Sequence, residues 1–371
     1  MLFAAGCAET PPTGSAVRRK EYAFIANGGS NSVSVVDLTR FRVVRTVAVG
    51  SGPTGITASP IRNEVYVVNT DSGTVSIVNA ASLQVESTAR VGRRPFSLEL
   101  SRDGATGFVA NSESNTVSVV NLSARRVVKT IPVGRAPGSL RAAPDGKTLL
   151  VSNRGADSIS IIDLDAMSVV ATVAVGSQPG PIAILPDSSQ AFVANAGDAS
   201  VSAVDLRSRR LLAHLETGKT PSSLALKPDG GELFVTNFDS DSLTIVNTYS
   251  DEVGESLRAG TNPSQAVVDP SGSILYFTNF GSNTVSILEI YSRRVLASIA
   301  VGAQPDALAL TPDGRYVLVL GSQSNDLAVV DAVRRSLFTV VPLGQSPRAV
   351  AIKVFESPAE GRDQGKDQQE R

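Results

Sequence analysis

The chain has 371 residues, of which 42% are hydrophobic and 19% are charged, and its formal net charge is −1. A near-zero charge argues against general nucleic-acid binding, which relies on a basic surface. The single cysteine excludes an intrachain disulfide, and no apolar stretch in the sequence is long enough to span a bilayer.

The first residues are apolar and small and end at Cys7. This stretch resembles the end of a bacterial lipoprotein signal peptide, in which the cysteine is lipidated. The basic region and most of the apolar region of such a signal are missing, which suggests a translation start further upstream. We therefore predict a signal remnant over 1–7, lipidation at Cys7, and a flexible polar tether over 8–17. The alternative is an unprocessed tail.

A 42-residue unit then repeats along almost the whole chain. One glycine of the unit recurs at Gly50, Gly92, Gly134, Gly176, Gly218, Gly260, Gly302 and Gly344. One proline recurs at Pro53, Pro95, Pro137, Pro179, Pro221, Pro263, Pro305 and Pro347. An asparagine recurs at Asn27, Asn69, Asn111, Asn153, Asn195, Asn237 and Asn279, with Gly321 at the eighth position.

Each unit predicts four short strands. In the third unit, alternating or β-branched residues mark strands over 95–100, 107–111, 116–121 and 126–133, separated by turns at 101–104 and 114–115. No helical period is sustained. A repeat of 40 to 50 residues that holds four strands is typical of a β-propeller blade.

Eight such blades account for residues 18–353. The chain begins with the second, third and fourth strands of a unit and ends with a first strand at 347–353. We therefore predict an all-β, eight-bladed β-propeller whose closing blade combines both ends of the chain. A seven-bladed ring is the alternative, although it would leave the apolar faces of one unit exposed. The polar segment 354–371 is predicted to be disordered.

The second strands resemble the Tyr-Val-Thr-Asn signature of the YVTN propeller family. The matching segments are Tyr66-Val67-Val68-Asn69, Phe234-Val235-Thr236-Asn237 and Tyr276-Phe277-Thr278-Asn279. The resemblance covers about nine-tenths of the chain and implies a bacterial envelope or surface protein, periplasmic or surface-exposed. The family signature builds the blade and transfers no catalytic residue. Wider relatives include lactonase-type propellers and the eight-bladed haem d1 domains of nitrite reductases.

The recurring asparagine has two interpretations, a ring of ligands or a structural device. We favour the structural one, because asparagine tolerates left-handed backbone and bonds nearby backbone groups, and Gly321 has no side chain that could bind a ligand.

The sequence assembles no catalytic set. The only histidine, His214, lies in a predicted fourth, outermost strand. One histidine and two methionines give poor support for transition-metal or haem ligation. A lactonase-like calcium site at the channel mouth is an alternative, with candidate ligands Asp71, Glu113, Asp157, Asp198, Asp239 and Asp241.

The connections between blades hold the candidate ligand-binding residues. Their variable side chains are expected to crowd the channel mouth and form a weakly basic site for an anion. The candidate ligand-binding residues are Arg93, Arg94, Phe96, Arg135, Gln178, Lys219, Gln304 and Arg348, accompanied by Asn262, Asp306 and Gln345. The opposing interpretation is an ordinary exposed face.

Basic pairs occur on the opposite face in every second blade, at Arg125-Arg126, Arg209-Arg210 and Arg293-Arg294. Such pairs can meet anionic lipid headgroups, although a solvated rim is the simpler interpretation.

The leading functional hypothesis is a non-enzymatic, envelope-anchored scaffold that binds a protein, a polymer or a small anion and carries no cofactor. It would contact the membrane only through its lipid anchor. The rival hypothesis is a lactonase-like or other hydrolase with a divalent cation in the channel mouth. A third is single-stranded nucleic-acid binding, against which scarce aromatics and near-zero charge argue.

Overall fold

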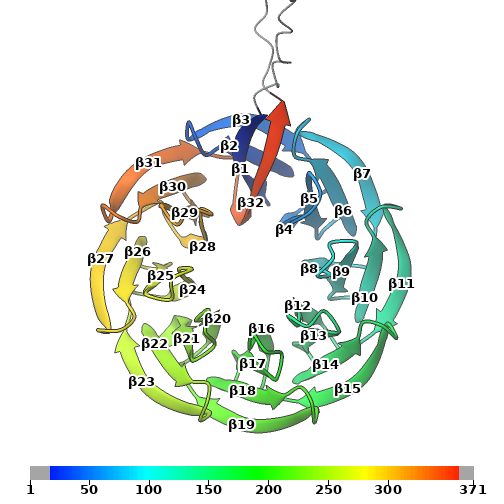
Figure 1. Ribbon diagram of the computed structural model, residues 1–371, viewed down its shortest axis with the longest axis vertical. Coiled ribbons are helices and arrows are strands. Elements are labelled where there is room, and N and C mark those ends of the chain that lie inside the picture. The colour runs from blue at the N-terminus through cyan, green and yellow to red at the C-terminus, as the bar shows by residue number, and fades with distance from the viewer. Residues whose placement is uncertain (1–16, 359–371) are drawn as a thin grey trace, which may run out of the picture.

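The computed structural model describes residues 17–358, which form eight four-stranded antiparallel sheets arranged as blades around a central axis (Figure 1). The eight-bladed, all-β prediction is confirmed. From the axis outwards, blade 1 holds β32 (Pro347–Pro358), β1 (Val17–Asn27), β2 (Ser32–Asp37) and β3 (Arg42–Ala48). Cys7 and residues 359–371 lie outside the described residues.

The other seven blades are continuous in sequence, and each runs from its first, innermost strand to its fourth, outermost strand. Blades 2 to 4 comprise β4 (Pro53–Ala58), β5 (Glu64–Asn69), β6 (Thr74–Asn79), β7 (Gln84–Arg90), β8 (Pro95–Leu100), β9 (Thr106–Asn111), β10 (Thr116–Asn121), β11 (Arg126–Pro132), β12 (Pro137–Ala142), β13 (Thr148–Asn153), β14 (Ser158–Asp163) and β15 (Ser168–Ala174).

Blades 5 to 8 follow the same order. They comprise β16 (Pro179–Ile184), β17 (Gln190–Asn195), β18 (Ser200–Asp205), β19 (Arg210–Glu216), β20 (Pro221–Leu226), β21 (Glu232–Asn237), β22 (Ser242–Asn247), β23 (Glu252–Arg258), β24 (Pro263–Val268), β25 (Ile274–Asn279), β26 (Thr284–Glu289), β27 (Arg294–Ala300), β28 (Pro305–Leu310), β29 (Tyr316–Gly321), β30 (Asp326–Asp331) and β31 (Ser336–Pro342). One 3₁₀ turn, η1 (Phe238–Ser240), interrupts blade 6.

Within the described residues, no helix has the length and apolar character needed to cross a membrane.

The antiparallel order gives the ring two distinct faces. Turns between second and third strands, together with the connections between blades, form what we call the mouth face. Turns between first and second strands and between third and fourth strands form the underside. β1 enters blade 1 from the underside, because Val17 pairs with Pro358 at that end and Asn27 pairs with Pro347 at the mouth face.

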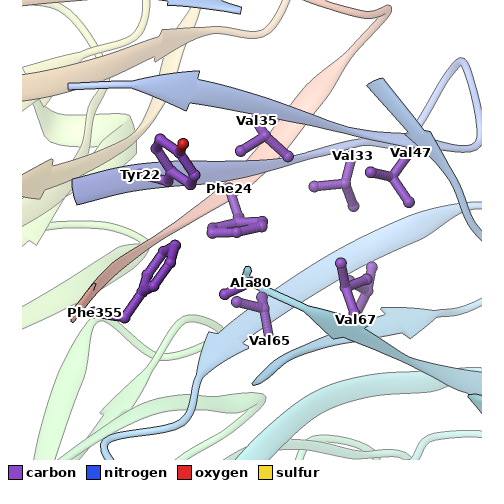
Figure 2. Close-up of a cluster of buried hydrophobic side chains, with 10 residues drawn as sticks. Tyr22, Phe24, Val33, Val35, Val47, Val65, Val67, Ala80 and Phe355 are labelled. Atoms are coloured by element: carbon purple, nitrogen blue, oxygen red, sulfur yellow. The ribbon is translucent and has the colours of Figure 1, made fainter. Parts of the chain in front are cut away.

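Each pair of neighbouring blades shares one apolar core. Figure 2 shows the core between blades 1 and 2, where Tyr22 and Phe24 of β1 pack near Val65 and Val67 of β5. The period-2 pattern of the second and third strands supplies these side chains to both flanking interfaces. Repeated burial of β-branched and aromatic residues is the main source of stability for such a ring.

The closing blade is longer than the sequence predicted. β32 continues through Pro358, so residues 354–358 belong to a strand, where we expected the disordered tail to begin at 354. The physical reason is Phe355, which is buried and packs edge-on against Tyr22 with ring centroids 5.6 Å apart. The charged and polar residues around Phe355 give the segment a polar composition, so the sequence did not predict this apolar contact.

Candidate functional site

A cavity of about 560 Å³ lies on the axis and opens towards the mouth face. The first strands of blades 3 to 8 provide most of its wall. A second cavity of about 470 Å³ continues towards the underside. Both cavities are lined by Glu99, Arg141, Leu224 and Ala266, so these four residues mark the depth at which the two meet.

Most polar side chains of the wall are used in joining one blade to the next. Ser97 Oγ donates to the carbonyl of Gly138 at 2.6 Å, and Ser264 Oγ donates to that of Pro305 at 3.1 Å. The amide of Leu308 donates to Gln265 Oε1 at 2.7 Å. These bonds close the inner edge of the ring, and they leave few side chains of the wall free to bind a ligand.

Glu99 and Arg141 are the charged residues at the level where the cavities meet. Both occupy the fourth position after the repeated proline, in adjacent blades. The other six blades carry uncharged residues at this position, namely Thr57, Ala183, Ala225, Val267, Ala309 and Ala351. The axial wall therefore has one basic and one acidic side chain at a single level, on one side of the ring.

The two side chains interact electrostatically without forming an ion pair. Burial raises the pKa of the Glu99 carboxyl, while the positive charge of Arg141 and the amide of Ala142, 3.3 Å from Glu99 Oε1, oppose the rise. Arg141 is exposed to the cavity, and within residues 17–358 no carboxylate lies within 4.0 Å of its guanidinium. Its donors are therefore available to a ligand.

Space beside Arg141 is open. The residue that follows the repeated proline is Gly138 in blade 4 and Gly180 in blade 5. A Cβ atom on Gly138 would have Ser152 Oγ at 3.6 Å as its nearest neighbour, and one on Gly180 would have the Ala194 carbonyl oxygen at 3.9 Å. No side chain therefore projects into the space at these two positions.

Asp306 lines the same cavity nearer its entrance. Burial raises the pKa of its carboxyl, and the charge of Arg348 opposes this rise from 3.9 Å. Asp306 was among the variable positions named from the sequence, whereas Glu99 and Arg141 were missed. The signal for both was present, since each places a charge in a first strand at a position that is uncharged in six other blades.

None of the eight candidate ligand-binding residues predicted from the sequence lines the axial cavity. Arg93 and Arg94 lie beside a separate surface pocket of about 470 Å³ with Asp71 and Glu113. Arg94 contacts both carboxylates, at 3.3 Å and 3.5 Å. The structure thus brings these two arginines together with acidic side chains, so this part of the mouth is less basic than expected.

The other six candidate residues lie on the connections between blades or, for Phe96 and Arg348, at the start of the first strand that follows. Phe96 is 53% exposed, and Arg135, Gln178, Lys219 and Arg348 are also exposed, while Gln304 is half-buried. Gln178 Oε1 accepts a bond from Arg154 at 3.3 Å. Ligand binding by this set stays a prediction.

Several of the proposed calcium ligands are held in structural hydrogen bonds. Asp157 accepts from the amide of Gln178 at 2.9 Å, Asp241 from that of Asn262 at 2.8 Å, and Asp198 from that of Ser177 at 2.8 Å. Across residues 17–358 no three histidine, cysteine or acidic side chains cluster as metal ligands would.

The recurring asparagine is structural, but the reason differs from the one expected. Asn237 is extended, with φ −112°, and its buried amide donates to Ser242 and Thr244 at 3.1 Å and 2.8 Å. The left-handed residue lies four positions later, as at Asp241 with φ 51°. Glycine recurs beside the asparagine because a Cβ on Gly134 would lie 2.5 Å from Asn153 Cγ.

His214 lies exposed on β19, the outermost strand of blade 5, as predicted. Its Nδ1 is 3.1 Å from Ser202 Oγ.

The basic pairs on the underside are partly neutralised. Arg125 forms ion pairs with Glu64 and Glu86 of blade 2, and Arg293 forms ion pairs with Glu232 and Glu255 of blade 6. These arginines connect neighbouring blades, which makes them less available to lipid headgroups than the sequence suggested.

Fold and wall together define an eight-bladed β-propeller with a charged axial cavity. A family model described as YNCE-like beta-propeller matches residues 171–293, from β15 of blade 4 to the outer turn of blade 7. No curated protein matches the chain.

Solved structures share the fold at low sequence identity. Hydrazine synthase of Kuenenia stuttgartiensis is 24% identical over 76% of this chain and 96% of its own, with a TM-score of 0.63. Dihydro-heme d1 dehydrogenase NirN, solved in complex with DHE, is 16% identical over 89% and 74%, with a TM-score of 0.77. A functionally unknown protein from Desulfotomaculum acetoxidans is 16% identical over 78% and 98%, with a TM-score of 0.63. These likenesses concern architecture alone.

Proposed function

We propose that this propeller is a non-enzymatic binding scaffold of the bacterial envelope that holds the anionic group of a small ligand in its axial cavity. The observation that carries the proposal is the guanidinium of Arg141, which lines a cavity of ligand size and has no carboxylate within 4.0 Å among residues 17–358. A guanidinium presents donors in a planar fork that matches a carboxylate or a phosphate.

Glu99 would tune this site with pH. Its raised pKa means that the carboxyl takes up a proton at a higher pH than an exposed glutamate does. A protonated Glu99 no longer repels an incoming anion and no longer competes for the charge of Arg141. Anion affinity should therefore increase as pH falls through the pKa of Glu99, with uptake of a proton on binding.

The tether over 8–17 and lipidation of Cys7 complete the proposal by placing the scaffold at a membrane. With an upstream signal restored, wild-type protein should partition into detergent and carry acyl chains on Cys7. A Cys7→Ser variant should be released as soluble protein. If that variant stayed in the membrane fraction, lipidation would not be the anchor.

The ligand site is tested by calorimetry and thermal shift with phosphate, sulfate, succinate and citrate at low salt. Arg141→Ala should weaken binding by about tenfold or more, since a hydrogen bond to a charged group is worth roughly 1.5–3 kcal/mol. Glu99→Gln should bind more tightly than wild type near neutral pH and should lose the pH dependence.

Arg135→Ala is the matched control, because Arg135 lies on the connection that leads into the same first strand. It should leave affinity within about twofold of wild type, as expected of an exposed substitution. Absence of a shift with every anion, or equal loss in both arginine variants, would refute the axial site.

A further inference from the structure

The outer turns of three consecutive blades expose apolar residues on the underside. The second residue of the turn between the third and fourth strands is Tyr249 in blade 6, Tyr291 in blade 7 and Val333 in blade 8, with exposed fractions of 80%, 97% and 80%. The same position in the other five blades holds Thr39, Ala81, Ser123, Asp165 and Arg207. The apolar turn tips are therefore confined to one arc of the ring.

Charge divides this arc further. Blade 6 follows its tyrosine with Asp251 and Glu252. Blade 7 instead carries Arg294, and blade 8 carries Arg334 and Arg335, all three exposed, with the guanidinium of Arg334 3.6 Å from the Asp331 carboxylate. Apolar tips and unburied arginines thus coincide at blades 7 and 8.

The apolar surface continues towards blade 1. Phe338 on β31 is 46% exposed and lies 5.3 Å from the ring of Phe41, which is in the outer turn of blade 1. Tyr316 completes this aromatic cluster, 4.9 Å from Phe41. Arg40 and Arg42 flank Phe41 and are exposed. We call Tyr291, Val333, Phe338, Arg294, Arg334 and Arg335 the underside patch.

The chain enters the ring next to this patch. β1 starts at Val17 on the underside of blade 1, which adjoins blade 8 (Figure 1). Cys7 precedes Val17 by ten residues, a length that spans at most about 35 Å when fully extended. A membrane that held Cys7 would therefore lie within reach of the underside and of the patch.

We propose that the underside patch docks on an anionic lipid bilayer. Tyrosine is favoured at the depth of the headgroups, where its ring is buried and its hydroxyl is hydrated, and arginines next to it meet lipid phosphates. The tips project singly from turns on the underside, and their side chains are exposed. This inference goes beyond the scaffold proposal and uses the anchor only to orient the ring.

The test uses the full chain with Cys7→Ser, so that no acyl chain contributes. Co-sedimentation with vesicles of phosphatidylcholine alone or with added phosphatidylglycerol should show binding only to the anionic vesicles, and salt should weaken it. Tyr291→Ser with Val333→Ser should reduce vesicle binding by about tenfold, as should Arg334→Ala with Arg335→Ala.

Blade 5 offers a matched control. Its outer turn carries Arg207 and Arg209 with no exposed apolar tip, so Arg207→Ala with Arg209→Ala removes equal charge from the same face. This control should bind vesicles within about twofold of the parent. An absence of vesicle binding, as expected if the patch serves a protein partner, or an equal loss in the control would overturn the inference. Neither result bears on anion binding at Arg141.

Discussion

At the scale of single residues, one hydrogen-bond network recurs in seven blades and changes as a unit in the eighth. Each buried asparagine donates to two hydroxyls, five and seven residues later, as Asn195 does to Ser200 and Ser202 at 2.9 Å. Blade 8 has Gly321, Asp326 and Ala328 at the three positions. Burial raises the pKa of the Asp326 carboxyl, although Ser324 offsets part of the rise. Blade 8 therefore lacks the bonds that secure its neighbours.

We predict that grafting the network into blade 8 stabilises the ring. The triple variant Gly321→Asn, Asp326→Thr and Ala328→Ser should gain about 1–3 kcal/mol in free energy of unfolding, from two buried hydrogen bonds and removal of a buried carboxyl. The hydroxyl of Ser324 lies in the space of the new Cβ and must rotate away, as a serine three positions after the asparagine is accommodated in most other blades, for example Ser114 and Ser240. Denaturant unfolding measures the change.

The single variant Gly321→Asn is the control. Without Asp326→Thr its side chain would clash with the carboxylate, so this variant should be less stable than wild type. A stable single variant combined with an unimproved triple variant would contradict the network as the reason for the repeat.

At the scale of elements, polar contacts clip the outer turn of one blade to its neighbours. Arg293, in the outer turn of blade 7, reaches Glu232 at the start of β21 and Glu255 on β23. Blade 6 uses the opposite polarity, since Asp251 accepts from Gln190 of blade 5 at 2.6 Å. Asp251 accepts at the position where Arg293 donates, and Gln190 donates at the position where Glu232 accepts. This matched exchange indicates that the contact itself is required at this point of the ring.

Arg293→Ala should lower the free energy of unfolding by about 1–3 kcal/mol, chiefly because it leaves the partly buried carboxylate of Glu232 without its partner, while the exposed Glu255 contributes less. Arg209→Ala tests the same turn position in blade 5, where no carboxylate of the described residues pairs with the arginine. That variant should change stability by less than about 0.5 kcal/mol. Equal losses in thermal or urea unfolding would show that the clip contributes nothing specific.

At the scale of the whole molecule, the ring has no open sheet edge because the last strand completes the first blade. β32 pairs with β1 along its full length, and Lys353 Nζ donates to the Ser59 carbonyl of blade 2 at 2.6 Å. Closure joins both ends of the chain into one cooperative unit and prevents edge-to-edge association.

Phe355→Ala should destabilise the ring by about 3 kcal/mol or more, as expected for removal of a buried aromatic side chain. A chain that ends at Pro358 keeps every contact of β32 and should unfold like wild type. A chain that ends at Ser346 lacks the strand and should aggregate. Differential scanning calorimetry and size-exclusion chromatography measure these outcomes, and equal behaviour of the two truncations would disprove closure by β32.

Most of the fold was predictable because the repeat samples one structural solution eight times. The proline, glycine and asparagine positions define the blade, and the missing first strand at Tyr22 implies closure by residues near Pro347. The candidate site was harder to predict, because its charged residues Glu99 and Arg141 depart from the repeat in only two blades. Arg94 looked free in sequence, yet its partners Asp71 and Glu113 come from turns 23 and 19 residues away that only the fold brings together.

Two of the eight residues at one wall position, Glu99 and Arg141, are charged and line the axial cavity. Each blade contributes one residue at this level; Ala183 and Ala225 also belong to the apolar cores between blades, whereas Glu99 and Arg141 line the axial cavity. Exchanging Glu99 or Arg141 would alter the electrostatic pattern of the axis without removing a side chain from these apolar cores. Under the proposed axial binding, substitution at these wall positions would change the preferred ligand while the 42-residue repeat is kept. The repeat thus preserves the ring, while the charge at this wall position differs between blades.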